Sequence, residues 1–144
     1  SPIKGEVVPL NKVNDEVFSG GLLGNGVAVI PDEGMVVSPI SGKVEAVLDS
    51  KHAIALKSNE GIEMLIHVGL DTVNLEGKHY EAHVSVGDNV NVGDKLLTFE
   101  IDKIKKLGYD LITPVIVCNS DNYSKINTEK IGKVNKGETI YSVE

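Results

Sequence analysis

Short apolar runs alternate with turn residues along this chain of 144 residues. Glycine, asparagine and aspartate separate the runs at frequent intervals, a pattern typical of β-strands joined by tight turns. The pattern predicts an all-β fold, an antiparallel sandwich or barrel with at most short helical turns, one of them at 102–106. No linker or low-complexity segment divides the sequence, so we expect residues 1–144 to form a single domain.

Two sequence units recur within the chain. The segment 1–7 (SPIKGEV) returns as 38–44 (SPISGKV). A second unit has the five-residue pattern V-x-x-G followed by Asp or Glu, and it occurs at 84–88, 90–94 and 134–138. These repeated strand-turn units predict two similar halves related by an approximate two-fold axis.

A predicted hairpin brings two histidines together. The polar tetrad 58–61 (SNEG) separates two apolar-rich runs, which is a hairpin signal. A turn symmetric about Asn59 and Glu60 would place His52 directly opposite His67, with their Cβ atoms about 5 Å apart. Two imidazoles at that distance can share one small anion.

The same register divides the hairpin into two faces. Ile62, Met64 and Ile66 form an unbroken apolar face, so we assign this face to the core. On the other face, Ile54 and Leu65 are expected to pair across the strands beside the histidines. Apolar surface around a polar pair favours a protein-docking site.

Composition narrows the classes of function. The formal net charge of -7 argues against a nucleic-acid-binding protein. No run approaches the roughly 20 apolar residues that a membrane span needs. The single cysteine, Cys118, allows no internal disulfide and suits a reducing compartment, so we expect a cytoplasmic protein. The sequence shows no signal peptide and no initiator methionine, as in a chain that is processed or excised from a longer polypeptide.

The segment 61–73 (GIEMLIHVGLDTV) resembles the active-site signature of the glucose-type enzyme IIA of the bacterial sugar phosphotransferase system. The similarity continues over nearly the whole chain, in 5–10 (GEVVPL), 15–18 (DEVF), 23–28 (LGNGVA), 38–42 (SPISG), 50–53 (SKHA) and 113–115 (TPV). It implies that His67 is phosphorylated and that His52 stabilises the transferring group. Ser50 stands where the family commonly has threonine, and its hydroxyl is expected to bond His52 and fix its tautomer.

The resemblance also implies partners. The family accepts phosphate from the histidine-containing phosphocarrier protein and passes it to a cysteine of enzyme IIB, for a glucose-type sugar that enters through enzyme IIC. The residues expected to contact these partners or to leave room for the phosphoryl group are Asp15, Val17, Phe18, Leu48, Ile54, Leu65, Gly69, Asp71 and Val73. Asp15 and Asp71 would form an acidic rim that attracts a basic partner. No cofactor or metal is assigned, although some relatives bridge the two histidines by zinc in a partner complex.

Two other families share parts of the pattern. Lipoyl and biotinyl carrier domains also use paired V-x-x-G-D turns, and Lys103 after an aspartate is similar to their attachment lysine, but those domains are shorter and present the lysine at a hairpin tip. Zinc peptidases of the lysostaphin type have a related β fold, and His52 and His67 offer two of the three ligands that zinc catalysis needs. The closing H-x-H motif of these peptidases is absent, and His79 and His83 are expected to be exposed.

Overall fold

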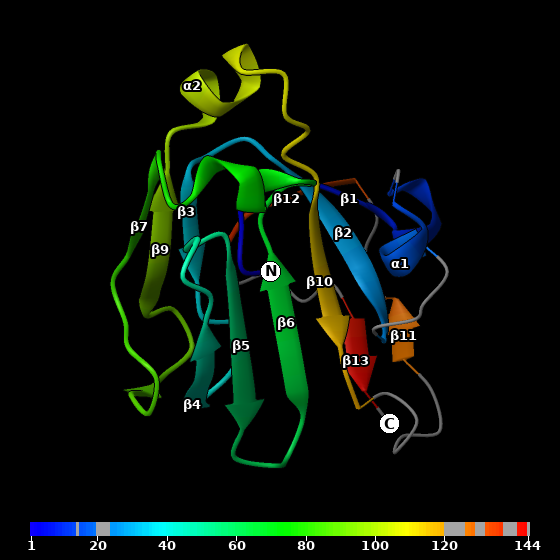
Figure 1. Ribbon diagram of the computed structural model, residues 1–144. Helices are drawn as coiled ribbons and strands as arrows, with labels where there is room; N and C mark the ends of the chain where they lie inside the picture. Colours follow the sequence, from blue (N-terminus) through cyan, green and yellow to red (C-terminus); the bar gives the residue numbers. More distant parts are fainter. Residues whose placement is uncertain (14, 20–23, 120–125, 129–131, 137–140, 144) are drawn as a thin grey trace.

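Antiparallel strands make up most of the computed structural model, which describes residues 1–13, 15–19, 24–119, 126–128, 132–136 and 141–143. Within these residues the largest sheet has eight strands, in the order β12-β1-β2-β10-β6-β5-β4-β8 (Figure 1). Their bounds are β1 Gly5–Pro9, β2 Asn25–Pro31, β4 Gly42–Val47, β5 Ala53–Ser58, β6 Glu63–His67, β8 Asn89–Val90, β10 Thr113–Val117 and β12 Gly132–Val134. Neighbouring strands pair antiparallel throughout this sheet. The predicted all-β class is therefore confirmed.

Smaller sheets and short helices complete the described part of the chain. One sheet contains β3 Met35–Val37, β9 Lys95–Phe99 and β7 Tyr80–Ala82, and another pairs β11 Ile126–Thr128 with β13 Tyr141–Val143. The helical segments are η1 Leu10–Lys12, α1 Glu16–Ser19, η2 Thr72–Leu75 and α2 Ile101–Lys106. The position of α2 confirms the helix expected from the sequence, and α2 projects beyond the strand ends at the top of Figure 1. None of the described helices is long and apolar enough to cross a membrane.

Apolar side chains pack on both faces of the large sheet. The main cluster joins this sheet to the three-stranded one through residues such as Val115, Leu96 and Leu97. A second cluster covers the opposite face and includes Phe18 of α1 and Ile116 of β10. Consecutive residues of β10 thus enter different clusters, as the two-residue alternation of a strand requires.

The strand registers repeat in two halves of the large sheet. Gly5 of β1 pairs with Val134 of β12, and Gly42 of β4 pairs with Val90 of β8 in the same relative position. β2 then follows β1 as β5 follows β4, and the halves meet where β10 pairs with β6. This pairing scheme supports the predicted approximate two-fold relation.

The repeated Ser-Pro-Ile unit also forms the same local contacts twice. Ser1 Oγ donates to the Ile3 carbonyl oxygen at 2.7 Å, and Ser38 Oγ donates to the Ile40 carbonyl oxygen at 2.6 Å. Both hydroxyls are buried, so each contact satisfies a polar group that the repeat places inside the fold.

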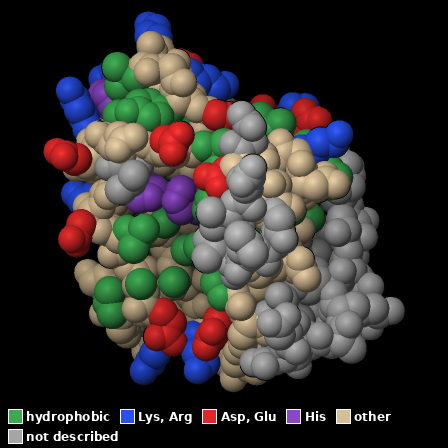
Figure 2. All heavy atoms as spheres, turned by 45° about the vertical axis from the view of Figure 1, so that its right-hand side comes forward, with side chains coloured by type: hydrophobic (Ala, Val, Ile, Leu, Met, Phe, Trp, Pro, Cys, Tyr) green, Lys and Arg blue, Asp and Glu red, His purple; other side chains and the backbone are tan. Residues whose placement is uncertain are grey.

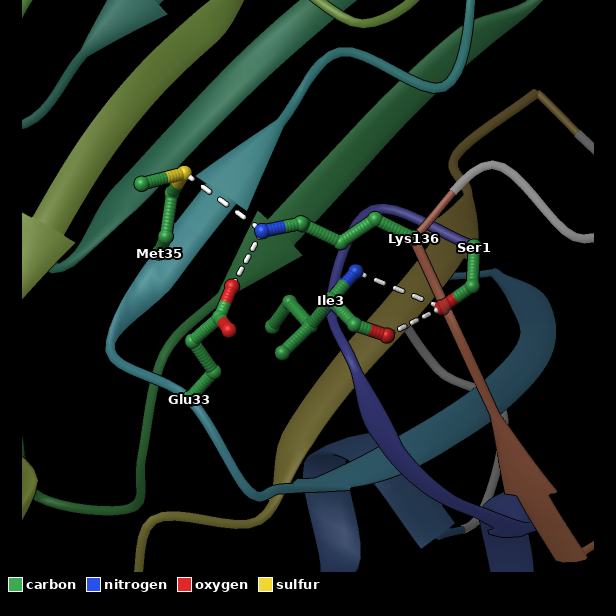
Figure 3. A network of polar contacts seen from close by, with 5 residues as sticks. All are labelled: Ser1, Ile3, Glu33, Met35 and Lys136. Carbon is green, nitrogen blue, oxygen red and sulfur yellow. Dashed lines mark hydrogen bonds and ion pairs between the residues drawn. The ribbon is translucent and has the colours of Figure 1, made fainter.

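Beside Ser1 and Ile3, a charged contact ties the late part of the chain to an early turn (Figure 3). Lys136 Nζ pairs with Glu33 Oε1 and lies 3.7 Å from the Met35 sulfur. The Lys136 ammonium lowers the pKa of Glu33 below its usual range. The contact fastens the segment after β12 to the loop before β3.

The observed register of the hairpin between β5 and β6 differs from the predicted register by one residue. The Ser58 N–H donates to the Ile62 carbonyl and the Gly61 N–H to the Ser58 carbonyl, so the turn is 59–61 rather than the predicted pair. Gly61 has a φ of 95°, the left-handed conformation with which such a loop ends. His67 therefore pairs with Ala53, and the prediction that it pairs directly with His52 is wrong.

The shifted register also changes one of the expected faces. Ile54 pairs with Ile66 and is 0% exposed, so the prediction that Ile54 lies on a docking surface is wrong. Met64 and Ile66 belong to the main core cluster, as predicted. Leu65 points to the other face, where it is half-buried against the second cluster.

Candidate active site

His67, the last residue of β6, has one ring nitrogen engaged and one available. The ring is half-buried beside Phe18, with 5.0 Å between the ring centroids. Its Nδ1 lies 2.8 Å from the Gly69 carbonyl oxygen. A carbonyl oxygen only accepts hydrogen bonds, so Nδ1 carries the proton and donates this bond. Nε2 is then the nitrogen whose lone pair is free to attack an electrophile.

His52 lies directly beside this ring despite the shifted register. The centroids of the two imidazoles are 4.6 Å apart and the rings are nearly perpendicular, at 84°. His52 precedes the first residue of β5 and follows Lys51, whose φ of 60° is left-handed, so the regular alternation of a strand does not fix its direction. The sequence thus predicted the right neighbours from an incorrect pairing.

The ring of His52 is deeply buried. Its residue is 2% exposed, and among the described residues its Nδ1 has no hydrogen-bond partner. Burial lowers the pKa of the ring and the backbone of Ser50 opposes this lowering, whereas in the described part of the chain the Ser50 hydroxyl makes no bond to Nδ1. The predicted bond from the Ser50 hydroxyl is therefore not made, and Ser50 acts on His52 through its backbone instead.

Burial keeps both imidazoles uncharged at neutral pH. Desolvation lowers the pKa of His67, against the Gly69 bond and the charges of Asp15 and Asp71, which raise it. Desolvation, assisted by the neighbouring His67, lowers the pKa of His52 to about 4. A neutral imidazole is the nucleophilic form, and its second nitrogen can still donate a hydrogen bond.

The Val68 peptide groups connect the two histidines. The Val68 N–H donates to the His52 carbonyl oxygen at 2.7 Å, which holds the backbones together. The Val68 carbonyl oxygen accepts two buried side-chain bonds, from Thr72 Oγ1 at 2.8 Å and from the Tyr80 hydroxyl at 3.0 Å. Sequence reasoning missed Thr72 and Tyr80, because a side chain that bonds a backbone carbonyl leaves no pattern in the sequence.

Gly69 is required by the shape of this segment. Its φ of 90° is left-handed, and a Cβ there would lie 2.6 Å from Thr72 Cγ2 and 3.1 Å from the Asp110 carbonyl oxygen. Neither the conformation nor the space accepts a side chain. Glycine therefore lets the chain curl back so that its carbonyl reaches His67.

Comparison with known proteins points to one family. The family model of the phosphoenolpyruvate-dependent sugar phosphotransferase system, EIIA 1, matches residues 1–123. The chain belongs to this family. Membership makes this enzyme IIA a phosphotransferase component and a phosphoryl carrier in sugar uptake.

Individual relatives agree with the family model. This enzyme IIA is 51% identical over 143 residues to the beta-glucoside-specific EIIBCA component of Bacillus subtilis, and the match covers 99% of this chain but 24% of that protein. It is 47% identical over 138 residues to the glucose-specific EIIA component of Oceanobacillus iheyensis, covering 96% of this chain and 84% of the relative. The glucose permease IIA of Mycoplasma capricolum has a similar structure, with a TM-score of 0.87 and 33% identity over 98% of this chain and 91% of that one.

The surface around the histidines of this enzyme IIA is apolar with acidic neighbours. Figure 2 shows adjoining histidine side chains bordered by hydrophobic and acidic ones. Leu48 is 44% exposed and Asp71 is exposed, whereas Asp15 is half-buried. Phe18 is 6% exposed, so it supports the His67 ring rather than offering a broad contact surface. The side chains of Val17 and Val73, also expected to contact partners, lie outside the described residues.

The structure also tests the two alternative families, the lipoyl or biotinyl carrier domains and the zinc peptidases of the lysostaphin type. Lys103 lies within α2 and pairs with Glu100 at 2.9 Å, so it does not occupy the hairpin tip of a lipoyl carrier. His79 contacts Glu100 at 3.4 Å, and the exposed His83 lies 3.0 Å from Thr98 Oγ1. Among the described residues no group of three or more His, Cys, Asp or Glu side chains is placed to hold a metal ion. Neither alternative is supported.

Proposed function

We propose that this enzyme IIA accepts a phosphoryl group from the histidine-containing phosphocarrier protein on Nε2 of His67 and passes it to the cysteine of an enzyme IIB. The supporting observation is the bond from His67 Nδ1 to the Gly69 carbonyl, because it leaves the Nε2 lone pair free beside a second imidazole. The relay would work in the cytoplasm. Relatives named for glucose and for beta-glucosides support a sugar of that kind as the final acceptor.

Each proposed transfer exchanges one bond to phosphorus for another. The Nε2 lone pair of His67 attacks the phosphorus of the donor phosphohistidine, and the electrons of the broken P–N bond return to the donor imidazole. Nδ1 keeps its proton, held by the Gly69 carbonyl. The thiolate of enzyme IIB then attacks the same phosphorus, and the departing electron pair restores the neutral His67. We assign no cofactor to either step.

The surface around the pair suits two successive protein partners. Leu48 and Leu65 provide apolar contact area, and the carboxylates of Asp15 and Asp71 lie near enough to His67 to raise its pKa. Such a rim attracts a basic partner and favours fast association that weakens with salt. We propose that the phosphocarrier and enzyme IIB use this surface in turn.

Phosphoryl acceptance can be measured directly. Incubation with phosphoenolpyruvate, enzyme I and the phosphocarrier should add one phosphoryl group per chain, seen by intact mass, that is labile in acid. Because Nδ1 is protonated toward Gly69, NMR of histidine-labelled protein should show the phosphorus bonded to Nε2. Omitting enzyme I is the control. A phosphoryl group on another residue, or on Nδ1, would contradict the proposal.

Docking is tested by an acidic substitution at Leu65. Leu65→Asp should weaken binding of the phosphocarrier, because the complex would desolvate an unpaired carboxylate at a cost of several kcal/mol. Ile66→Ala should change binding little but lower the free energy of unfolding by roughly 2–5 kcal/mol, since Ile66 is fully buried. Calorimetric titration and a thermal melt of each variant provide both quantities.

A matched control places the same charge away from the histidines. Val92 is 60% exposed in the turn after β8, so Val92→Asp should leave both binding and stability near wild type. Equal weakening by Leu65→Asp and Val92→Asp would indicate a general charge effect and would remove Leu65 from the docking surface.

A further inference from the structure

A buried tyrosine outside the active-site signature contacts the backbone that follows His67. Tyr80 is the first residue of β7, and its hydroxyl donates to the Val68 carbonyl oxygen at 3.0 Å. We propose that Tyr80 is a positioning residue for His67, which holds the backbone whose carbonyl selects the reactive tautomer. The kinetic consequence rests on the proposed function, whereas the tautomer itself is a property of the free protein.

The contact acts through one peptide group. The Val68 carbonyl belongs to the peptide that joins Val68 to Gly69, and Gly69 holds a φ of 90°. Rotation of this peptide plane changes that φ and moves the Gly69 carbonyl oxygen, which accepts the bond from His67 Nδ1 at 2.8 Å. Fixing the Val68 oxygen therefore fixes the acceptor that keeps the proton on Nδ1 and the lone pair on Nε2.

Tyr80 is held in a single place by its surroundings. It is 6% exposed, and its ring stacks on Phe99 with 6.0 Å between centroids and 28° between planes. Burial raises the pKa of Tyr80 to about 12, so the hydroxyl keeps its proton and remains a donor at neutral pH. Thr72 Oγ1 donates to the same Val68 oxygen, so both acceptor positions of that carbonyl are used. Through Tyr80, the three-stranded sheet thereby supports the active-site backbone that follows β6 of the eight-stranded sheet.

The test removes the hydroxyl alone. Tyr80→Phe keeps the ring against Phe99 while the Val68 carbonyl loses one donor. In free protein with labelled histidine, nitrogen NMR should show a smaller fraction of His67 protonated at Nδ1. In the transfer assay, kcat for acceptance should fall about three- to tenfold, the effect of one hydrogen bond, with KM for the phosphocarrier unchanged.

A second pair of variants checks the same oxygen from its other donor. Thr72→Val should shift the tautomer and kcat in the same direction, and Thr72→Ser, which keeps the hydroxyl, should restore them. Ser38→Ala is the matched control, since it removes a buried hydroxyl that bonds the Ile40 carbonyl elsewhere in the fold. It should lower thermal stability without changing the His67 tautomer.

The outcomes separate this inference from the proposed function. Wild-type tautomer fractions and kcat in both Tyr80→Phe and Thr72→Val would overturn the positioning role, even if the melting temperatures fall. If Tyr80→Phe does not fold, the Thr72→Val and Thr72→Ser pair decides whether the Val68 oxygen controls the tautomer. If the wild-type protein accepts no phosphate, the proposed function is lost, while the tautomer comparison still decides the role of Tyr80.

Discussion

Glutamine in place of His67 is expected to abolish phosphoryl acceptance. The lone pair of an amide nitrogen is delocalised into its carbonyl group, so glutamine offers no nitrogen nucleophile to phosphorus. The fold should persist, because His67 is half-buried and the new amide can still donate toward the Gly69 carbonyl. Intact mass after incubation with phosphoenolpyruvate, enzyme I and the phosphocarrier should show no added group.

His83 provides the matched control for this substitution. It is exposed, and in the part of the chain that the structure describes its ring contacts only the hydroxyl of Thr98, so His83→Gln should be labelled fully. A thermal melt of both variants excludes unfolding as the cause. Labelling of the His67→Gln protein at the wild-type level would place the nucleophile elsewhere and end the assignment.

Glutamine in place of His52 is expected to separate acceptance from onward transfer. His67 should still be phosphorylated, but transfer to enzyme IIB should slow by about two to three orders of magnitude, the usual loss when one donor to a developing anion is removed. His52 lies 4.6 Å from His67 between ring centroids. A phosphoryl group on His67 would raise the pKa of His52 from about 4, because nearby negative charge favours the protonated ring. Protonation gives the ring a second donor.

Single-turnover kinetics provide the measurement. Wild-type and His52→Gln proteins are loaded to the same extent and mixed with purified enzyme IIB, and loss of the phosphohistidine is followed in time. The loading rate of each protein from the phosphocarrier serves as the internal control. Onward transfer at the wild-type rate would show that His52 has a structural role alone.

The sequence predicted the histidine pair but not the contacts that orient it. The hairpin signal at 58–61 was sufficient to bring His52 and His67 together, because a shift of one residue still leaves them at adjacent positions across two strands. The shift itself was not predictable from polarity, since it depends on the left-handed φ of Gly61. The same shift moved Ile54 from the expected surface into the core.

Backbone contacts account for most of what sequence reasoning missed. The Gly69 carbonyl selects the His67 tautomer and the Val68 carbonyl is held by two hydroxyls, yet every residue type has such a carbonyl. The all-β class and the helix at α2 followed more readily, because both depend on the local spacing of apolar and turn residues. The partner contacts assigned to the docking residues other than Ile54 stay predictions.

The duplicated strand registers show that the fold itself does not require histidines at the two active-site positions. Because Gly26 pairs with Ile116 as Ala53 pairs with His67, Ile116 occupies the position equivalent to His67, and Asn25 the position equivalent to His52. Ile116 is fully buried among apolar side chains there. One half thus uses this position for packing. In the other half the neighbouring His52 ring is buried, and among the described residues its Nδ1 has no hydrogen-bond partner, which costs stability. The two halves of the scaffold are nearly symmetric, but only the half built from β4, β5 and β6 contains the histidine pair. The loss of stability caused by the buried imidazole therefore falls on that half.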